Sequence, residues 1–216
     1  ADAVLSRNGQ TLYFSSDRPG GYGGIDLYKA ELNDEGQWVN VQNLGPTVNT
    51  EFNEVAPFIH YSDKVMFFSS EGHNSIGGKD VFMATLDDTT WTNVTNVGFP
   101  VNTTGDDRYY VVPPDGRRGY FSSSRASGGY HDIFRVTGNL PELPITMLLK
   151  GKVYLNDKPI ASDLTFYKKE ELDGEYKSDP ANGIYNAIVE PNGIYDVVVQ
   201  PIGNIPAYRE TITLPD

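Results

Sequence analysis

Serines and aspartates recur at a fixed spacing, and they are the first residues in this sequence that could do chemistry. Each serine follows a phenylalanine, and each aspartate opens a short apolar run. The repeated positions are Phe14, Ser15, Asp26, Phe68, Ser69, Asp80, Phe121, Ser122 and Asp132. A serine could act as a nucleophile, but none of these lies in a Gly-x-Ser-x-Gly elbow, and one active site needs only one nucleophile. The pattern therefore indicates architectural serines that bond to strand ends or loops.

The aspartates admit two interpretations. A carboxylate could bind calcium together with backbone carbonyl oxygens. It could also accept hydrogen bonds from the glycine-rich loop that precedes it, and repetition in every copy favours this second role. The loop Gly20–Gly24 superficially resembles a phosphate loop, but no helix and no Lys-Ser pair follow it. Gly77-Gly78 and Gly128-Gly129 repeat it, so we predict hairpin loops that need positive φ.

The histidines, tyrosines and carboxylate pairs of the sequence do not indicate a particular site. His60, His73 and His131 occupy unrelated positions of the pattern and form no His-x-x-x-His pair. Tyr22 and the pair Tyr109-Tyr110 could line a ligand funnel or could pack between strands. A pair of carboxylates for glycoside hydrolysis would be distant in sequence, and nothing singles one out. We therefore assign no catalytic, cofactor-binding or metal-binding residue.

Composition removes several classes of function. The chain has 216 residues, with 17 Lys and Arg against 29 Asp and Glu, which gives a net charge of −12. Nucleic acids and anionic membranes need clustered positive charge, so neither is an expected partner. The absence of cysteine excludes disulfides, thiolate metal sites and cysteine nucleophiles. No apolar run approaches the roughly 20 residues of a membrane span, so direct membrane insertion is not expected.

The serine and aspartate positions belong to an internal repeat. The phenylalanine of the Phe-Ser-Ser motif moves from Phe14 to Phe68 and then to Phe121, with offsets of 68 − 14 = 54 and 121 − 68 = 53. The linker Leu44–Thr50 recurs as Val97–Thr103, with the same second offset. A repeat of this length, rich in aromatic and β-branched residues and punctuated by Gly, Asn and Pro, is typical of a β-propeller blade.

Each repeat is predicted to form four short strands. In the second copy they are expected near Val55–Ile59, Lys64–Ser69, Asp80–Leu86 and Trp91–Val94. The fold class predicted for residues 1–138 is therefore all-β, with three four-stranded blades, although the third copy has prolines where its last strand should be. Since propellers have about four to eight blades, we expect part of a larger propeller truncated at its N-terminus. Pairing of the three blades with another chain is the alternative.

The repeat ends before the last third of the chain. Residues 139–147 are expected to be a linker. Residues 148–216 contain alternating apolar residues and the turn signals Asn182-Gly183 and Asn192-Gly193. Strands with Asn-Gly turns predict a small antiparallel β-sandwich.

Two families resemble these segments. The string Leu12–Tyr28, with its Phe-Ser-Ser, glycine loop and Asp-Leu-Tyr, is similar to the PD40 (WD40-like, TolB-type) propeller repeat. The second copy matches it well, and the third has a loop one residue shorter. The C-terminal pattern Gly151-x-Val153, Pro159-Ile160 and Tyr195-x-Val197 loosely resembles the carboxypeptidase regulatory-like domain, a transthyretin-like sandwich. In this order the two resemble OmpA-family outer-membrane-associated proteins of the Bacteroidetes.

The resemblance implies a function without catalysis. Proteins of this kind are periplasmic scaffolds associated with the outer membrane, and some serve the type IX secretion system. Their partners would be other proteins of the secretion complex, with peptidoglycan bound only through an OmpA-like domain that is absent from this chain. No cofactor is implied. The alternative is a glycan-binding or glycan-processing propeller with an acidic and aromatic central funnel.

Overall fold

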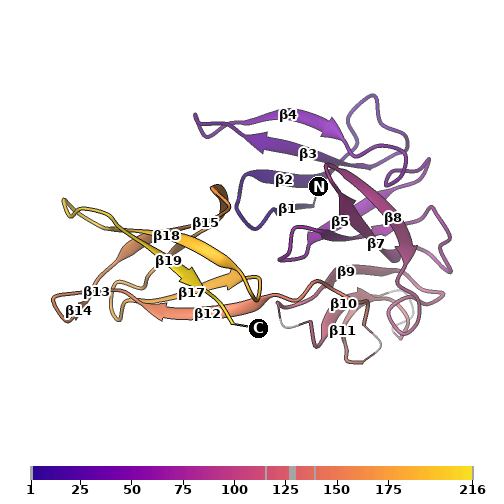
Figure 1. Ribbon diagram of the computed structural model, residues 1–216. Helices are drawn as coiled ribbons and strands as arrows, with labels where there is room; N and C mark the ends of the chain where they lie inside the picture. Colours follow the sequence, from indigo (N-terminus) through magenta and orange to yellow (C-terminus); the bar gives the residue numbers. More distant parts are fainter. Residues whose placement is uncertain (1, 115, 127–129, 139, 216) are drawn as a thin grey trace. The chain divides into compact units, whose positions relative to one another are not determined.

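The computed structural model of this protein is all-β and describes residues 2–114, 116–126, 130–138 and 140–215 (Figure 1). These ranges contain nineteen strands and no helix. The chain divides into two compact units: Ala1–Ser6 with Gln10–Pro144, and Arg7–Gly9 with Ile145–Asp216. Within the described ranges there is accordingly no helix with the length and hydrophobicity needed to cross a lipid bilayer.

The first two repeats fold into four-stranded antiparallel sheets, each with its strands in sequence order. The first sheet consists of β1 (Ala3–Leu5), β2 (Thr11–Ser16), β3 (Asp26–Leu32) and β4 (Trp38–Asn43). The second consists of β5 (Glu54–Ile59), β6 (Val65–Ser70), β7 (Asp80–Asp87) and β8 (Thr90–Asn96). All four strands predicted for the second copy are present, with closely similar bounds.

The third repeat departs from the prediction of four-stranded blades. Its sheet has three strands among the described residues: β9 (Asp107–Val111), β10 (Gly119–Ser123) and β11 (Asp132–Val136). Pro141 and Pro144 follow β11 closely, and proline cannot donate the backbone hydrogen bond that a paired strand needs. The predicted glycine loop Gly128-Gly129 lies outside the described residues.

Successive sheets pack face to face. One buried cluster joins Tyr13 and Leu27 of the first sheet to Phe68 and Phe82 of the second. A second cluster joins the opposite face of the second sheet to the third, and its members are Val65, Phe67, Val81, Val101, Tyr110, Val112, Phe121 and Val136. Alternate residues of one strand thus serve two different cores, because side chains alternate across a sheet. This succession of antiparallel sheets fits part of a β-propeller.

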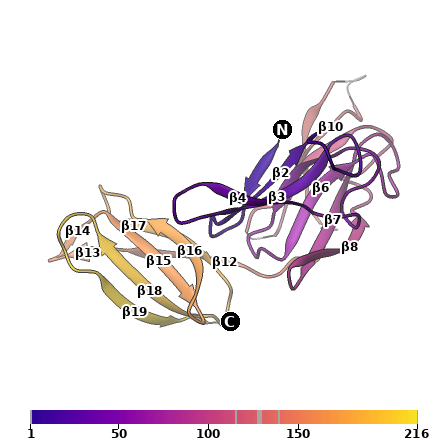
Figure 2. The same cartoon turned by 90° about the horizontal axis from the view of Figure 1, so that it is seen from above.

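The second unit contains two antiparallel sheets that share one core (Figure 2). The larger has the order β16-β15-β18-β19, formed by β16 (Glu171–Lys177), β15 (Ser162–Lys168), β18 (Ile194–Pro201) and β19 (Tyr208–Thr213). The smaller pairs β12 (Met147–Lys152) with β17 (Ile184–Val189), and β13 (Tyr154–Leu155) forms a short ribbon with β14 (Lys158–Pro159). Ala187 and Val189 of β17 pack on Phe166 of β15.

One expectation for this unit needs correction. Met147, placed in the linker by its sequence, is the first residue of β12. The Asn-Gly turns join strands of different sheets, because β17 pairs with β12 and not with either of its neighbours in the chain. The turn at Asn192-Gly193 carries the chain from the smaller sheet to the larger one.

Candidate functional site: the linkers between the repeated sheets

The linkers that join successive sheets are held by side-chain hydrogen bonds from two equivalent asparagines. The Asn102 side chain bonds to both backbone groups of Val81, accepting from its N–H at 2.8 Å and donating to its carbonyl oxygen at 2.7 Å. Asn49 makes the same pair of bonds to Leu27, at 2.8 and 2.9 Å. Both side chains also donate to an asparagine at the end of the preceding strand, Asn96 and Asn43 respectively. Each linker is therefore fixed to the sheet it leaves.

A buried carboxylate ends each linker and begins the next sheet. Glu54 accepts hydrogen bonds from the Thr50 backbone N–H at 2.9 Å, the Thr50 hydroxyl at 2.6 Å and the Ser70 hydroxyl at 2.6 Å. Asp107, its counterpart in the next copy, accepts from the backbone N–H and hydroxyl of Thr103 at 2.6 and 2.9 Å. Both carboxylates are fully buried. Buried charge is costly unless it is bonded, and these donors satisfy that requirement.

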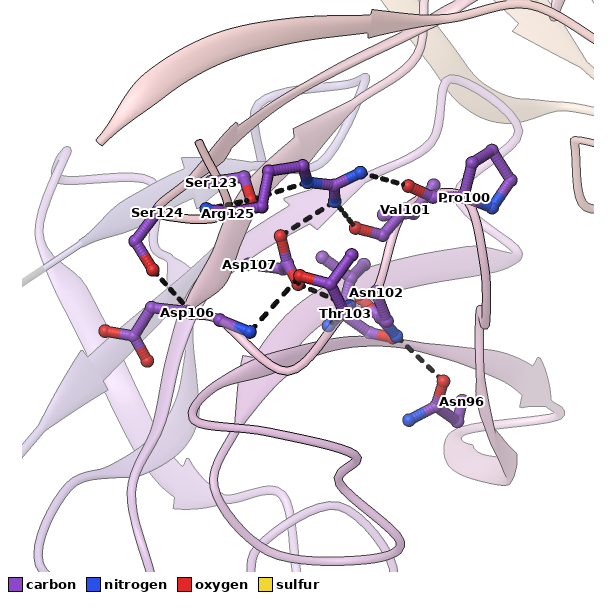
Figure 3. Close-up of polar contacts among 12 residues, drawn as sticks. Asn96, Pro100, Val101, Asn102, Thr103, Asp106, Asp107, Ser123, Ser124 and Arg125 are labelled. Atoms are coloured by element: carbon purple, nitrogen blue, oxygen red, sulfur yellow. Dashed lines mark hydrogen bonds and ion pairs between the residues drawn. The ribbon is translucent and has the colours of Figure 1, made fainter. Parts of the chain in front are cut away.

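The third repeat adds an arginine to this arrangement, and Figure 3 shows the result. The Arg125 guanidinium donates to the Pro100 carbonyl oxygen at 2.6 Å, to the Val101 carbonyl oxygen, and to Asp107 at 2.9 Å. Its Nε donates to the Ser123 hydroxyl at 2.8 Å. The aspartate is one carbon shorter than Glu54, and the guanidinium reaches it from the loop after β10. We call Asn102, Asp107 and Arg125 with these partners the linker network.

The predicted phenylalanines form cross-strand aromatic pairs. Their partners are Tyr28, Phe82 and Phe134, with ring centroids 5.9, 5.9 and 5.8 Å apart. The three pairs are Phe14–Tyr28, Phe68–Phe82 and Phe121–Phe134.

A basic or imidazole side chain covers each aromatic pair. Arg18 lies 4.8 and 5.0 Å from the ring centroids of the first pair, and Arg125 lies 4.8 and 5.1 Å from those of the third. His73 takes this place in the second copy, where its ring is also 3.0 Å from the Val48 carbonyl oxygen. The aromatic pairs of the second and third copies are thus part of the contact between a sheet and the linker before it.

The predicted serines do not share one role. The Ser15 hydroxyl accepts from the Asp2 N–H at 2.8 Å, Ser69 is buried with no hydrogen-bond partner for its hydroxyl among the described residues, and Ser122 is half-buried. The loop contacts belong to the serines one position later. Ser16, Ser70 and Ser123 each accept a backbone N–H from the following loop. The second serine faces the loop because side chains alternate along the strand.

Two of the predicted aspartates hold loops in place. Asp26 accepts from the Tyr22 and Gly23 N–H groups at 2.6 and 2.9 Å, and Asp80 accepts from the Ile76 N–H at 2.6 Å. Burial raises the pKa of Asp80 above its ordinary value, against the lowering effect of its hydrogen bonds. Asp132 differs, because it is exposed. Among the residues described, no group of three or more His, Asp or Glu side chains is placed to hold a metal ion.

The glycine loops were expected to need positive φ, and only Gly20 of Gly20–Gly24 has it. The other glycines are required for space. A Cβ on Gly23 would come within 2.0 Å of the Phe52 carbonyl oxygen, and one on Gly77 would come within 2.5 Å of the Thr104 carbonyl carbon. The loops therefore pack directly on the following linker.

His60 lies buried between β5 and β6, where its Nδ1 is 3.0 Å from the Ser62 hydroxyl. Burial lowers the pKa of His60, so the folded state resists protonation. The unfolded state takes up the proton near its ordinary pKa of 6.5 and therefore binds more protons just below that pH. We expect the thermal unfolding midpoint to fall as the pH drops below about 6.5. In calorimetry His60→Gln should flatten this decrease and His131→Gln should keep it; an unchanged slope in His60→Gln would contradict the assignment.

The first strands of successive sheets lie side by side and carry a second polar group. Ala56 and Tyr109 occupy equivalent positions, at bulges in β5 and β9, and have positive φ of 53° and 57°. The Asp2 carboxylate accepts from the Ala56 N–H at 3.1 Å and from the Tyr109 hydroxyl at 3.3 Å. Bulges with unusual backbone angles are frequent near binding sites. Tyr110 is buried in the core and Tyr22 lies in the first glycine loop, so the three tyrosines do not converge.

The second unit holds an apolar groove of about 480 Å³. Tyr154, Leu155, Tyr185 and Tyr208 line it together with the aliphatic core of β18. Lys152 and Glu210 supply its charged groups. Such a lining suits an apolar ligand but contains no catalytic constellation.

No family model matches the chain, and no curated protein matches it. TolB from Acinetobacter baumannii is a similar solved structure, with a TM-score of 0.45 and 16% identity over 99% of this chain and 46% of that one. A prolyl endopeptidase structure matches with a TM-score of 0.36 and 14% identity over 97% and 29%. The chain spans less than half the length of either protein.

Proposed function

We propose that this chain is a non-catalytic protein-interaction module of a periplasmic scaffold that is associated with the outer membrane and tethered to the cell wall. Its place would be in the type IX secretion machinery, as a PorE-like component, with carboxypeptidase regulatory-like architecture in the second unit. One observation carries the proposal. The polar side chains repeated once per sheet direct their hydrogen bonds to the chain's own backbone and hydroxyls.

This use of polar groups suits a rigid support for loops. Glu54, Asp107, Asn49 and Asn102 fix each linker, and Asp26 fixes the first glycine loop. Loops held by a rigid scaffold present constant surfaces, which is what protein docking requires. Tyr22 and Ile76, in the glycine loops of the first and second copies, are 52% and 55% exposed and offer large apolar side chains to a partner.

Crosslinking from single cysteines tests the proposal, because the chain has none of its own. Tyr22→Cys and Ile76→Cys would be labelled with a photoreactive group and irradiated in envelope fractions, followed by mass spectrometry. Asp34→Cys, in the exposed β3–β4 turn away from these loops, is the matched control. We expect secretion-machinery proteins to be captured from the glycine loops and not from Asp34. Capture of none of them, or turnover of a glycan by the purified protein, would refute a non-catalytic secretion scaffold.

A glycan-binding function is the second candidate, and the contact between Asp2 and Tyr109 favours it. A carboxylate beside a half-exposed tyrosine ring is a common way to bind a sugar, since the ring packs on its apolar face and the acid accepts from its hydroxyls. Glycan-array binding that is lost in Tyr109→Ala and retained in Tyr120→Ala would establish it. No binding by the unmodified chain would exclude it.

A further inference from the structure

The outer face of the first sheet exposes apolar residues in a regular pattern. Leu5, Trp38 and Val41 are 48%, 40% and 44% exposed, and they lie on β1 and β4 around the Phe14–Tyr28 aromatic pair. We call these residues, with Arg18, the open face.

The same positions are covered in the second sheet. Ile59, the counterpart of Leu5, is 6% exposed, and Trp91, the counterpart of Trp38, is 2% exposed. The Trp91 ring packs edge-on against Tyr13 of the first sheet, with centroids 5.8 Å apart. In the second sheet, which has a preceding sheet, both positions are therefore buried.

Arg18 repeats half of the linker network. Its guanidinium lies over the Phe14 and Tyr28 rings at 4.8 and 5.0 Å, and its Nε donates to the Ser16 hydroxyl at 3.1 Å, as Arg125 Nε does to Ser123. Arg125 also bonds two linker carbonyls and Asp107. In the described part of the chain, the side-chain hydrogen bond of Arg18 goes to Ser16 alone. In Arg125 it is the two Nη groups that bond the linker carbonyls.

We propose that the open face binds a further sheet of the same repeat, which places a Val-Asn-Thr-x-x-x-Asp linker over Arg18. The Ser-x-Arg sequence of the first copy matches Ser123-Ser124-Arg125, whereas the second copy has His73 with Glu54. The acid of the incoming linker is accordingly an aspartate, because the guanidinium takes up the space that the longer glutamate side chain fills. In the incoming sheet, the residues that correspond to Tyr13 and Leu27 cover Trp38 and Val41.

The occupant is a preceding repeat and not a second copy of this chain. In both observed junctions the linker comes directly from the fourth strand of the preceding sheet, through Asn43 and Asn96. The third sheet has no such strand among the described residues, and Gly138, Pro141 and Pro144 stand where that fourth strand should be. A second copy could offer its third sheet but not the linker.

A duplicated repeat tests the proposal. A copy of residues 1–53, followed by one added aspartate, would be fused in front of residue 1, with W38F in the added copy. We expect the emission of the original Trp38 to move to shorter wavelength and the unfolding midpoint to rise by several degrees. R18M in the original copy should abolish most of both changes. Trp38 emission that stays unchanged, or gains that survive R18M, would overturn the proposal.

Two measurements on the unfused chain keep the test decisive if the fusion does not fold. Trp38→Arg should lower the unfolding midpoint much less than Trp91→Arg, because Trp38 is 40% exposed and Trp91 is 2% exposed. Equal losses would show that the open face already has a partner within the chain. Sedimentation should find a monomer at micromolar concentration; a dimer that protects Trp38 from acrylamide quenching would assign the face to a second copy and overturn the proposed occupant.

Discussion

Replacement of Arg125 by methionine should lower the unfolding free energy of the first unit by about 3 kcal/mol, because it leaves a buried carboxylate without its cation. Asp107 is fully buried and, among the described residues, would keep only the bonds from Thr103. The carbonyl oxygens of Pro100 and Val101 would lose their donors at the same time. Methionine keeps much of the packing on the Phe121 ring, so the loss reports mainly on the polar contacts. Urea titration followed by tryptophan emission measures it.

Arg18→Met is the matched control for this substitution. It removes the same contact with an aromatic pair but no bond to a linker, so we expect a loss of about 0.5–1 kcal/mol. Arg125→Lys should fall between the two, since a lysine restores the charge without the planar fork. Equal losses in Arg125→Met and Arg18→Met would mean that the bonds of Arg125 to the linker carbonyls and to Asp107 contribute nothing to stability.

Replacement of Asn102 by alanine should cost about 2–3 kcal/mol, since it leaves the buried Val81 N–H without a partner and removes two further hydrogen bonds. The second of these joins the linker to Asn96 at the end of β8. Without the amide oxygen and nitrogen of Asn102, the linker loses its side-chain bonds to the sheet it leaves. Denaturant unfolding of the purified chain gives the value.

Asn74→Ala provides the control for this loss. Asn74 is exposed and contributes its backbone carbonyl oxygen to Asn96, which alanine retains. We expect a change within about 0.5 kcal/mol. Asn49→Ala should repeat the Asn102→Ala result, because its three bonds are the same. A marked difference between the two asparagines would contradict an equivalent role in the two linkers.

The repeat itself made most of the first unit predictable. A nearly constant offset between the copies identified the units, and turn residues between aromatic runs located their strands. Phe14, Phe68 and Phe121 proved to be equivalent because each faces the same neighbour across the sheet. Local periodicity carries this information, since strand pairing here is between neighbours in the chain.

The linker network could not be predicted from the sequence as easily. Glu54 and Asp107 share the offset of the repeat, but their different side chains conceal the equivalence, and the linker motif ahead of them was the available signal. The choice between Ser15 and Ser16 depends on which face of β2 meets the loop, which two adjacent serines do not reveal. Gly23 is needed because the backbone of Phe52, in the following linker, packs directly on it, and sequence spacing says nothing of that contact.

The pairing of β12 with β17 determines the order in which the second unit can fold. Met147 lies opposite Val189, so this ladder joins segments that are separated by the whole of β13 to β16, whereas β15 and β16 meet across a tight turn. Closing a long loop costs chain entropy before any contact repays it, so the local hairpin forms early and the smaller sheet forms late. A nascent chain on the ribosome must therefore carry β12 unpaired, with Leu148 and Leu149 accessible to chaperones, until β17 has emerged.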